Sequence, residues 1–227
     1  GLDVRAMRLP GMASDIERLN DMTAATWCEA AVREWSACRR RYSRAVLVGY
    51  SMGGALALHA AASQAPDLLI LLAPLVRIAH PLAETLPVAR YAVRRIRPFA
   101  RLPWDNPAVH AWFRRALPTI DTTDPAIQRF LRDEAAFSTA MLNELRVLAR
   151  RALRLAAHVR APTVMVQGVQ DTIVLPRHSR ALVRRLGGRV SYRELPGDHF
   201  LPLPSFGHWP RLARLLHQEL DLWEAAD

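Results

Sequence analysis

The sequence predicts an α/β fold with a mostly parallel, doubly wound sheet, and three observations lead to this class. Short apolar runs with the length of buried strands alternate with longer segments of helical periodicity. The runs are apolar at nearly every position, which is typical of parallel strands covered by helices on both faces. With 227 residues, 51% of them hydrophobic, the chain is also long enough to bury one sizeable core.

Each element is placed by its local pattern. The short apolar runs predict strands at 3–7, 44–48, 68–72, 162–167 and 189–195. The segments of helical periodicity predict helices at 24–40, 52–63, 177–186 and 208–223.

Residues 76–159 interrupt this alternation. They are rich in Arg, Ala, Leu and Pro, and they contain helical stretches but no convincing strand. Because proline ends or kinks a helix, the many prolines of this segment predict several short helices. We therefore expect three parts: a first core segment at 1–75, a helical cap insertion at 76–159 over one edge of the sheet, and a second core segment at 160–227.

The charge of the chain is strongly positive but dispersed. Its 31 basic residues are all arginine, and with 21 acidic residues they give a formal net charge of +10. The arginines are interleaved with Asp and Glu along the whole chain, and no motif that combines basic and aromatic residues for nucleic-acid binding is present. We therefore interpret most of them as a solvated surface and expect no nucleic-acid partner.

The two cysteines, Cys28 and Cys38, both fall in the helix expected at 24–40, where ten residues separate them by about 15 Å. That distance is too long for a disulfide, and neither cysteine has the spacing of a metal site. No apolar run reaches the roughly 18 to 20 residues of a membrane span, and no leader precedes the first strand. These features predict free thiols and a cytoplasmic protein.

The stretch LVGYSMGGALAL, at 47–58, contains a G-x-S-x-G pattern formed by Gly49, Tyr50, Ser51, Met52 and Gly53. Between a strand and a helix, this pattern is typical of a nucleophile elbow, a tight turn that lifts the serine hydroxyl above the sheet. Both glycines are then expected to be sterically required. The start of the following helix favours negative charge, so the Met52 amide is the expected oxyanion donor. The alternative is a serine in an ordinary turn.

A serine nucleophile needs a base, and the base needs an acid that orients it. Asp171 follows a buried strand, in the loop at the carboxyl end where catalytic groups gather in parallel sheets, and is the expected acid. His199, in the loop after the last strand, is the expected base because that loop can reach back over the serine. The alternative base is His208, at the start of the final helix. Asp198 is expected to shape the turn beside His199.

These residues identify a resemblance to the α/β-hydrolase superfamily, and within it to esterases and monoacylglycerol-lipase-like serine hydrolases. The matching segments are RLPGMAS at 8–14, GYSMGG at 49–54, LLAP at 71–74, APTVMVQGVQDTIVLP at 161–176 and PGDHF at 196–200. The resemblance implies an α/β-hydrolase sheet with a cap. Family members also carry, before the RLPG segment, strands and a loop whose His-Gly pair supplies a second oxyanion amide. Residues 1–7 hold no such pair, so we expect these amino-terminal strands to be missing, either because the chain is part of a longer protein or because it has diverged.

The predicted function is hydrolysis of carboxylic esters, either acylglycerols or short- to medium-chain acyl esters, through an acyl-serine and with no metal or organic cofactor. Two alternatives stay open: a thioesterase or acyltransferase that uses the same triad, and a hydrolase-like binding protein with an impaired site. The stretch at 86–104, LPVARYAVRRIRPFARLPW, mixes apolar residues with arginines. This mixture suits contact with anionic lipid or a cover for an acyl-chain pocket, and equally a packed cap with a solvated face.

Overall fold

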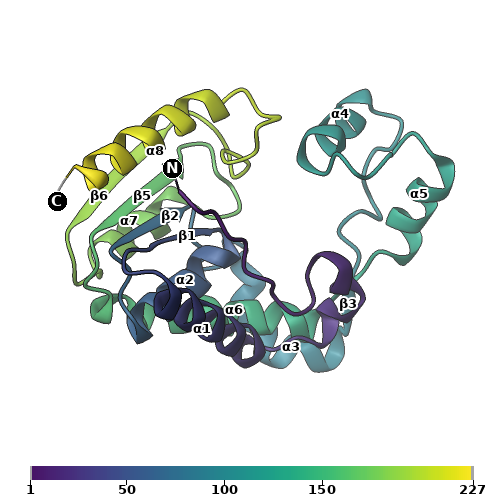
Figure 1. Ribbon diagram of the computed structural model, residues 1–227. Coiled ribbons are helices and arrows are strands. Elements are labelled where there is room, and N and C mark those ends of the chain that lie inside the picture. Colours follow the sequence, from purple (N-terminus) through teal and green to yellow (C-terminus); the bar gives the residue numbers. More distant parts are fainter. Residues whose placement is uncertain (1, 226–227) are drawn as a thin grey trace.

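The computed structural model describes residues 2–225 and contains a four-stranded parallel sheet (Figure 1). Its order is β1-β2-β5-β6, formed by β1 (Val46–Tyr50), β2 (Leu68–Leu72), β5 (Thr163–Gly168) and β6 (Val190–Leu195). Neighbouring strands pair in parallel register throughout. The predicted α/β class is therefore confirmed, and four of the five expected strands form within two residues of their predicted bounds.

Helices cover both faces of this sheet. One face is covered by α1 (Ala24–Arg41), α2 (Met52–Ser63), α6 (Thr139–Leu155) and α7 (Pro176–Val183), and the other by α8 (Trp209–Glu224). Successive strand residues point to opposite faces, so Leu69 and Leu71 pack toward the first group, while Leu68 and Ile70 pack toward α8. The two central strands, β2 and β5, are buried at every position, whereas Val48 of the edge strand β1 is 55% exposed and the edge strand β6 is only partly buried.

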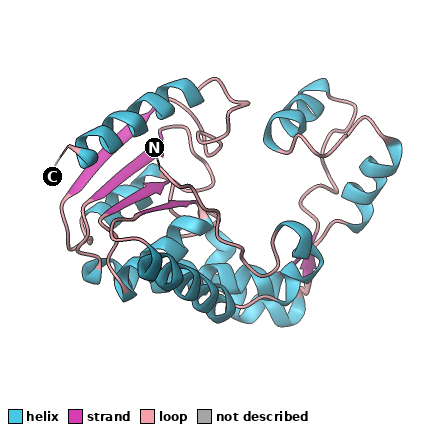
Figure 2. Cartoon of the chain, viewed as in Figure 1, coloured by secondary structure: helices cyan, strands magenta, loops and turns pink. Residues whose placement is uncertain are grey.

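The segment between β2 and α6 is built from short elements that stand beside the sheet (Figures 1 and 2). Its helices are a 3₁₀ turn (Pro81–Thr85), α3 (Leu86–Ala92), α4 (Pro107–Ala116), α5 (Pro125–Arg129) and a π turn (Phe130–Glu134). Proline begins α4 and α5, where its missing N–H costs nothing, and the residue before each proline caps the helix. A separate aromatic cluster around Trp104 and Phe113 holds α4 and α5 together.

Helix α6, although it belongs to the predicted insertion, packs against α1 and α2. Its buried residues Met141, Leu148 and Ala152 join the main core cluster. Part of the 76–159 segment thus supports the sheet rather than standing apart from it. The division of the chain at 75 and 159 stays a prediction.

Two sequence-based expectations about strands are wrong. Residues 3–7 form no strand, because no neighbouring strand pairs with them. Val4 is 87% exposed, and the segment is tied to the surface through contacts of Asp3 and Arg5 with Tyr42. The insertion, in turn, does contain a ladder: β3 (Arg95–Ile96) pairs antiparallel with β4 (Phe137–Ser138). Strands of two residues are too short to show periodicity in a sequence.

The remaining 3₁₀ turns are Ala13–Asp21, before α1, and Ala156–His158, after α6. Both cysteines lie on α1 and are free, as predicted. Within residues 2–225, no helix combines the length and the apolar character needed to cross a bilayer.

Candidate active site

Ser51 lies in a sharp turn between the end of β1 and the start of α2, as the G-x-S-x-G pattern predicts. Its φ of 52° and ψ of −118° place a residue with a side chain in a region that usually suits glycine. Such a conformation costs about 1–3 kcal/mol and persists only when its surroundings fix it. Here the Ser51 N–H donates to the Leu72 carbonyl (3.0 Å), and the Ser51 carbonyl accepts from the Leu75 N–H (2.8 Å).

The glycines around Ser51 differ in what they require. A Cβ on Gly49 would lie 2.5 Å from the Gly53 carbonyl oxygen and 2.7 Å from the Ala57 Cβ, so Gly49 is sterically necessary. A Cβ on Gly54 would lie 2.7 Å from Pro74. A Cβ on Gly53 meets no atom within 4 Å, so the expectation that Gly53 is sterically required is wrong. The turn presses strand and helix together at Gly49 and Gly54, whereas Gly53 points into open space.

Gly49→Ala is expected to lower the free energy of unfolding by about 3 kcal/mol or more, because backbone atoms must move to admit the new methyl group. Gly53→Ala is the matched control, since the same methyl group meets open space within α2 and alanine favours a helix by about 1 kcal/mol over glycine. Urea unfolding of both variants measures the difference. Equal stabilities would contradict the tight packing at Gly49.

Three side chains from separate loops form one hydrogen-bonded line. His199 Nε2 lies 2.9 Å from Ser51 Oγ, and His199 Nδ1 lies 2.8 Å from Asp171 Oδ2. With the ring proton on Nδ1, the imidazole donates to Asp171 and accepts from the serine hydroxyl. The side chain of Asp171 is fully buried and that of His199 is 8% exposed, so little water competes for these contacts. The structure therefore brings together the three residues that the sequence singles out.

Asp171 is held as a carboxylate by several donors. Its Oδ1 accepts from the N–H groups of Ile173 (2.9 Å) and Val174 (2.8 Å), and its Oδ2 accepts from Gln167 Nε2 (2.9 Å) as well as from His199. Burial alone would raise the pKa of Asp171, but the hydrogen bonds from His199, Val174 and Gln167 outweigh it and hold the pKa below its usual value. The acid is thus ionised when the imidazole needs a negative partner.

Gln167 supports this arrangement but was not anticipated from the sequence. It is fully buried at the end of β5, and Ser179 Oγ donates to its Oε1 at 2.6 Å. That bond fixes which end of the amide faces Asp171. The signal was present in TVMVQG, because a single polar residue in an otherwise apolar buried strand needs a partner.

The loop that carries His199 is fixed at several points. The Tyr50 hydroxyl donates to the His199 carbonyl at 2.9 Å, and Asp198 Oδ1 accepts from the Phe200 N–H at 2.9 Å, which is the turn-shaping role expected of Asp198. Burial, together with the charges of Asp171 and Asp198, raises the pKa of Tyr50, so its hydroxyl stays protonated. His208, the alternative base, lies instead at the cap of α8, against Gly197.

Met52 opens the first turn of α2, where backbone N–H groups have no partner within the helix and the helix dipole is positive. An anion developing beside Ser51 would meet this end of the helix. The role of the Met52 amide as an oxyanion donor stays a prediction.

Aromatic contacts connect the His199 loop to the short helices beside the sheet. Phe200 meets the edge of His199 with ring centroids 5.9 Å apart, and it meets Trp112 of α4 at 5.4 Å in an edge-to-face arrangement. Ser205 Oγ also donates to the Arg115 carbonyl at 2.6 Å. Helix α4 therefore touches the loop that holds the imidazole.

A parallel sheet with a strained serine at a strand-to-helix turn, joined to a histidine and a buried aspartate, defines a serine hydrolase of the α/β-hydrolase superfamily. Comparison with known families agrees. The chain belongs to the family described as serine aminopeptidase, S33, whose model matches residues 11–197.

Solved structures share this fold at low sequence identity. The chain is similar to a structure from a study of LipS and LipT, two metagenome-derived lipolytic enzymes. The two chains share 16% identity over 96% of this chain and 80% of the other, with a TM-score of 0.71. It is also similar to the monoacylglycerol lipase of Paleococcus ferrophilus, with 17% identity over 86% and 76% of the two chains and a TM-score of 0.56. A third is the RedJ thioesterase of the Streptomyces coelicolor prodiginine pathway, with 22% identity over 93% and 77% and a TM-score of 0.53. No curated protein matches the chain.

Proposed function

We propose that this protein hydrolyses carboxylic esters through an acyl-serine intermediate, with Ser51 as nucleophile, His199 as general base and acid, and Asp171 as the group that orients the imidazole. The observation that carries the proposal is the continuous line of contacts from Ser51 Oγ through both ring nitrogens of His199 to the Asp171 carboxylate, at 2.9 and 2.8 Å. These distances suit proton transfer without rearrangement of the three side chains.

The reaction divides into two halves. In the first, Ser51 Oγ attacks the ester carbonyl carbon while His199 Nε2 takes the hydroxyl proton. The tetrahedral intermediate then collapses, and the imidazolium gives that proton to the departing alcohol. In the second, His199 takes a proton from water, the resulting hydroxide attacks the acyl-serine, and the acid leaves as Ser51 regains its proton. Asp171 stays ionised throughout and stabilises the imidazolium.

The negative oxygen of each tetrahedral intermediate would lie at the start of α2, where the Met52 N–H can donate to it. Neither half-reaction calls for a metal or an organic cofactor. Acyl esters such as acylglycerols are the proposed substrates, because two similar structures come from a lipolytic enzyme and a monoacylglycerol lipase. A thioester would pass through the same steps, with a thiol in place of the alcohol.

A fluorophosphonate probe tests the nucleophile directly, because it forms a covalent bond only with an activated serine. The wild-type protein is expected to be labelled, and Ser51→Ala is expected to abolish labelling. Ser43→Ala, which changes an exposed serine outside the site, is the matched control and should label normally. Labelling that survives in Ser51→Ala would contradict the proposal.

The class of bond can then be separated by substrate. We expect p-nitrophenyl esters of graded acyl length to be hydrolysed faster than aminoacyl p-nitroanilides, which report the aminopeptidase activity that the family description names. Faster cleavage of the anilides would replace the ester proposal with an amide one and leave the assignment of Ser51 intact.

A further inference from the structure

Residues 86–104 form a segment whose charged residues all carry the same sign. They contain five arginines, at 90, 94, 95, 97 and 101, and no aspartate or glutamate. The eight consecutive residues 91–98, YAVRRIRP, are all exposed. Arg94, Arg95 and Arg97 of this stretch are therefore exposed on the surface of the protein.

Large apolar side chains are exposed among these arginines. Val88 is 76% exposed, Tyr91 74% and Val93 50%, and the nearby Leu82 is 62% exposed. Ile96 is 41% exposed. Single exposed apolar residues are common, but several within one short segment mark a surface that meets another apolar phase.

An open hollow of about 560 Å³ lies in the same segment. It is lined by Arg95, Ile96, Arg97, Pro98, Ala100 and Arg101. Three of these lining residues are arginines, and a guanidinium group offers the paired N–H donors that bind phosphate in two-point contacts. The hollow therefore has the chemistry to hold a phosphate group.

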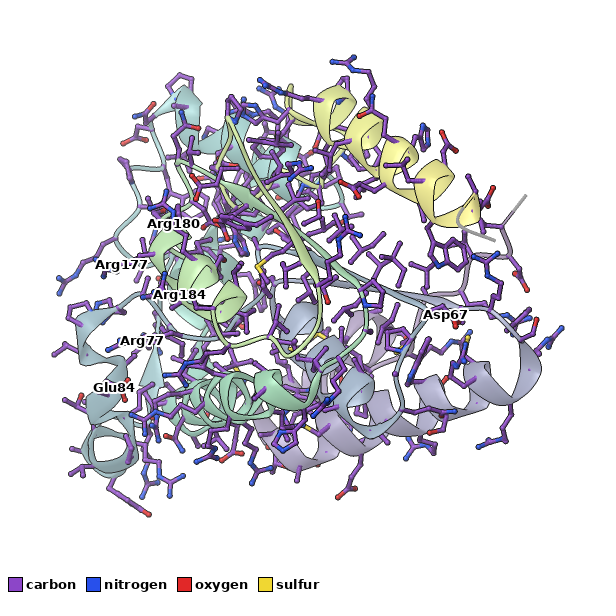
Figure 3. All side chains as sticks on the ribbon, turned by 90° about the vertical axis from the view of Figure 1, so that its left-hand side faces the viewer. Asp67, Arg77, Glu84, Arg177, Arg180 and Arg184 are labelled. Carbon is purple, nitrogen blue, oxygen red and sulfur yellow. The ribbon has the colours of Figure 1, made fainter. Side chains whose placement is uncertain are left out.

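Several arginines elsewhere in the molecule are paired with carboxylates. Figure 3 shows Arg177 and Arg180 on α7 and Arg184 directly after it, with Arg77 and Glu84 below them. Glu84 contacts three arginines, Arg77 (3.9 Å), Arg146 (3.6 Å) and Arg150 (2.5 Å), and Arg180 pairs with Glu194 at 2.7 Å.

By contrast, among residues 2–225 none of the five arginines of the 86–104 segment forms a salt bridge with a carboxylate. Arg90 lies over the Tyr91 ring, with its guanidinium carbon 5.0 Å from the ring centroid. The positive charge of this segment is therefore available to an anionic partner.

The backbone that carries these side chains is anchored. Thr139, at the start of α6, donates through its hydroxyl to the Val93 carbonyl (2.5 Å) and through its N–H to the Arg94 carbonyl (3.0 Å). Strand β3 pairs with β4 immediately beside these bonds. A segment fixed in this way loses little conformational entropy when it binds a surface.

We propose that Leu82 and residues 86–101 form a docking surface for an anionic phospholipid bilayer. The arginines contact headgroup phosphates, the hollow between Arg95 and Arg101 takes one headgroup, and the exposed apolar side chains enter the boundary between headgroups and acyl chains. The apolar residues favour a bilayer over a nucleic acid, because nucleic acids are bound through basic and aromatic side chains and Tyr91 is the single large exposed aromatic of the segment. The surface acts independently of the proposed hydrolysis.

Vesicle flotation tests the docking surface without any enzymatic readout. The full chain, carrying Ser51→Ala to prevent turnover, is mixed with vesicles of phosphatidylcholine alone or of phosphatidylcholine with phosphatidylglycerol. We expect it to float with the anionic vesicles and to remain behind with the neutral ones. Failure to float with the anionic vesicles would overturn the proposal and leave the hydrolase assignment untouched.

Variants then locate the surface. Arg94→Gln with Arg95→Gln is expected to lower the partition coefficient about 30-fold, since each arginine near an anionic membrane contributes about 1 kcal/mol. Arg211→Gln with Arg214→Gln removes the same charge from exposed positions of α8, on the other face of the sheet. We expect this control variant to change the partition coefficient far less. An equal loss in both variants would mean attraction by net charge and would overturn the assignment to this segment.

The apolar contribution has its own variant. Tyr91→Ser with Val93→Ser keeps every charge, and we expect it to weaken flotation at low salt and to weaken it further at about 1 M salt, where screening removes most of the electrostatic attraction. Thermal unfolding monitors the fold of each variant. Unchanged flotation of this variant, together with competition by single-stranded RNA for wild-type binding, would assign the surface to nucleic acid and overturn the lipid proposal.

Discussion

His199→Ala is expected to lower kcat for a p-nitrophenyl ester about 10⁶-fold, because Ser51 then has no base to take its proton and the departing alcohol has no acid. KM is expected to change little, since the imidazole acts mainly in the transition state. Steady-state hydrolysis measures both constants. His217→Ala, an exposed histidine on α8, is the matched control and should leave kcat unchanged.

The effects of His199 and Ser51 are also expected not to add. Because each residue works only through the other, Ser51→Ala combined with His199→Ala should be no slower than either single variant. A His199→Ala enzyme within tenfold of wild-type activity would remove His199 from the reaction. A double variant far slower than both singles would show that the two act independently.

Asp171→Asn is expected to lower kcat about 10⁴-fold, the scale seen when a triad carboxylate becomes an amide. The physical reason lies in the donors around Asp171. Both of its oxygens accept hydrogen bonds, so the amide NH₂ of asparagine must face either His199 and Gln167 or the N–H groups of Ile173 and Val174. In the first orientation the imidazole tautomer is wrong for accepting the serine proton. The same kinetic assay measures the loss, and a loss below tenfold would contradict the role of Asp171.

Acid should reduce the stability gap between the wild-type protein and Asp171→Asn. The folded pKa of Asp171 lies below its unfolded value of about 3.9, so its carboxylate stabilises the fold above that value. This contribution is lost as the pH falls through the folded pKa. Urea unfolding at neutral pH and at about pH 3 compares the two proteins. A gap that widens in acid would contradict the depressed pKa.

The sequence predicted the sheet well where each segment carried its own pattern. The run at 68–72 is buried at every position, so its bounds match those of β2. The prediction of a strand at 3–7 was wrong because a strand also needs a hydrogen-bonding neighbour, and local composition does not show whether one is present. The β3–β4 ladder was missed because two residues carry no period.

The candidate site could be predicted as far as chain order and loop position allow. Ser51, Asp171 and His199 were found from where strands end, and their contacts follow from the parallel sheet. Gly53 was misread because a motif gives spacing and not the direction in which a missing Cβ would point; the crowded neighbour is Gly54. Gln167 was overlooked although its polar side chain in a buried strand was a signal, because the sequence does not show that its partner is Asp171. Tyr50 acts through a hydrogen bond to a loop far along the chain, which no local pattern reveals.

The Tyr50 hydroxyl donates a hydrogen bond to the His199 carbonyl and so joins the two chain segments that carry the nucleophile and the base. Tyr50 directly precedes the nucleophile, so the strand that delivers the serine also clamps the loop that delivers its base, 149 positions further along the chain. The distance between the serine hydroxyl and the imidazole is therefore already set in the protein without substrate.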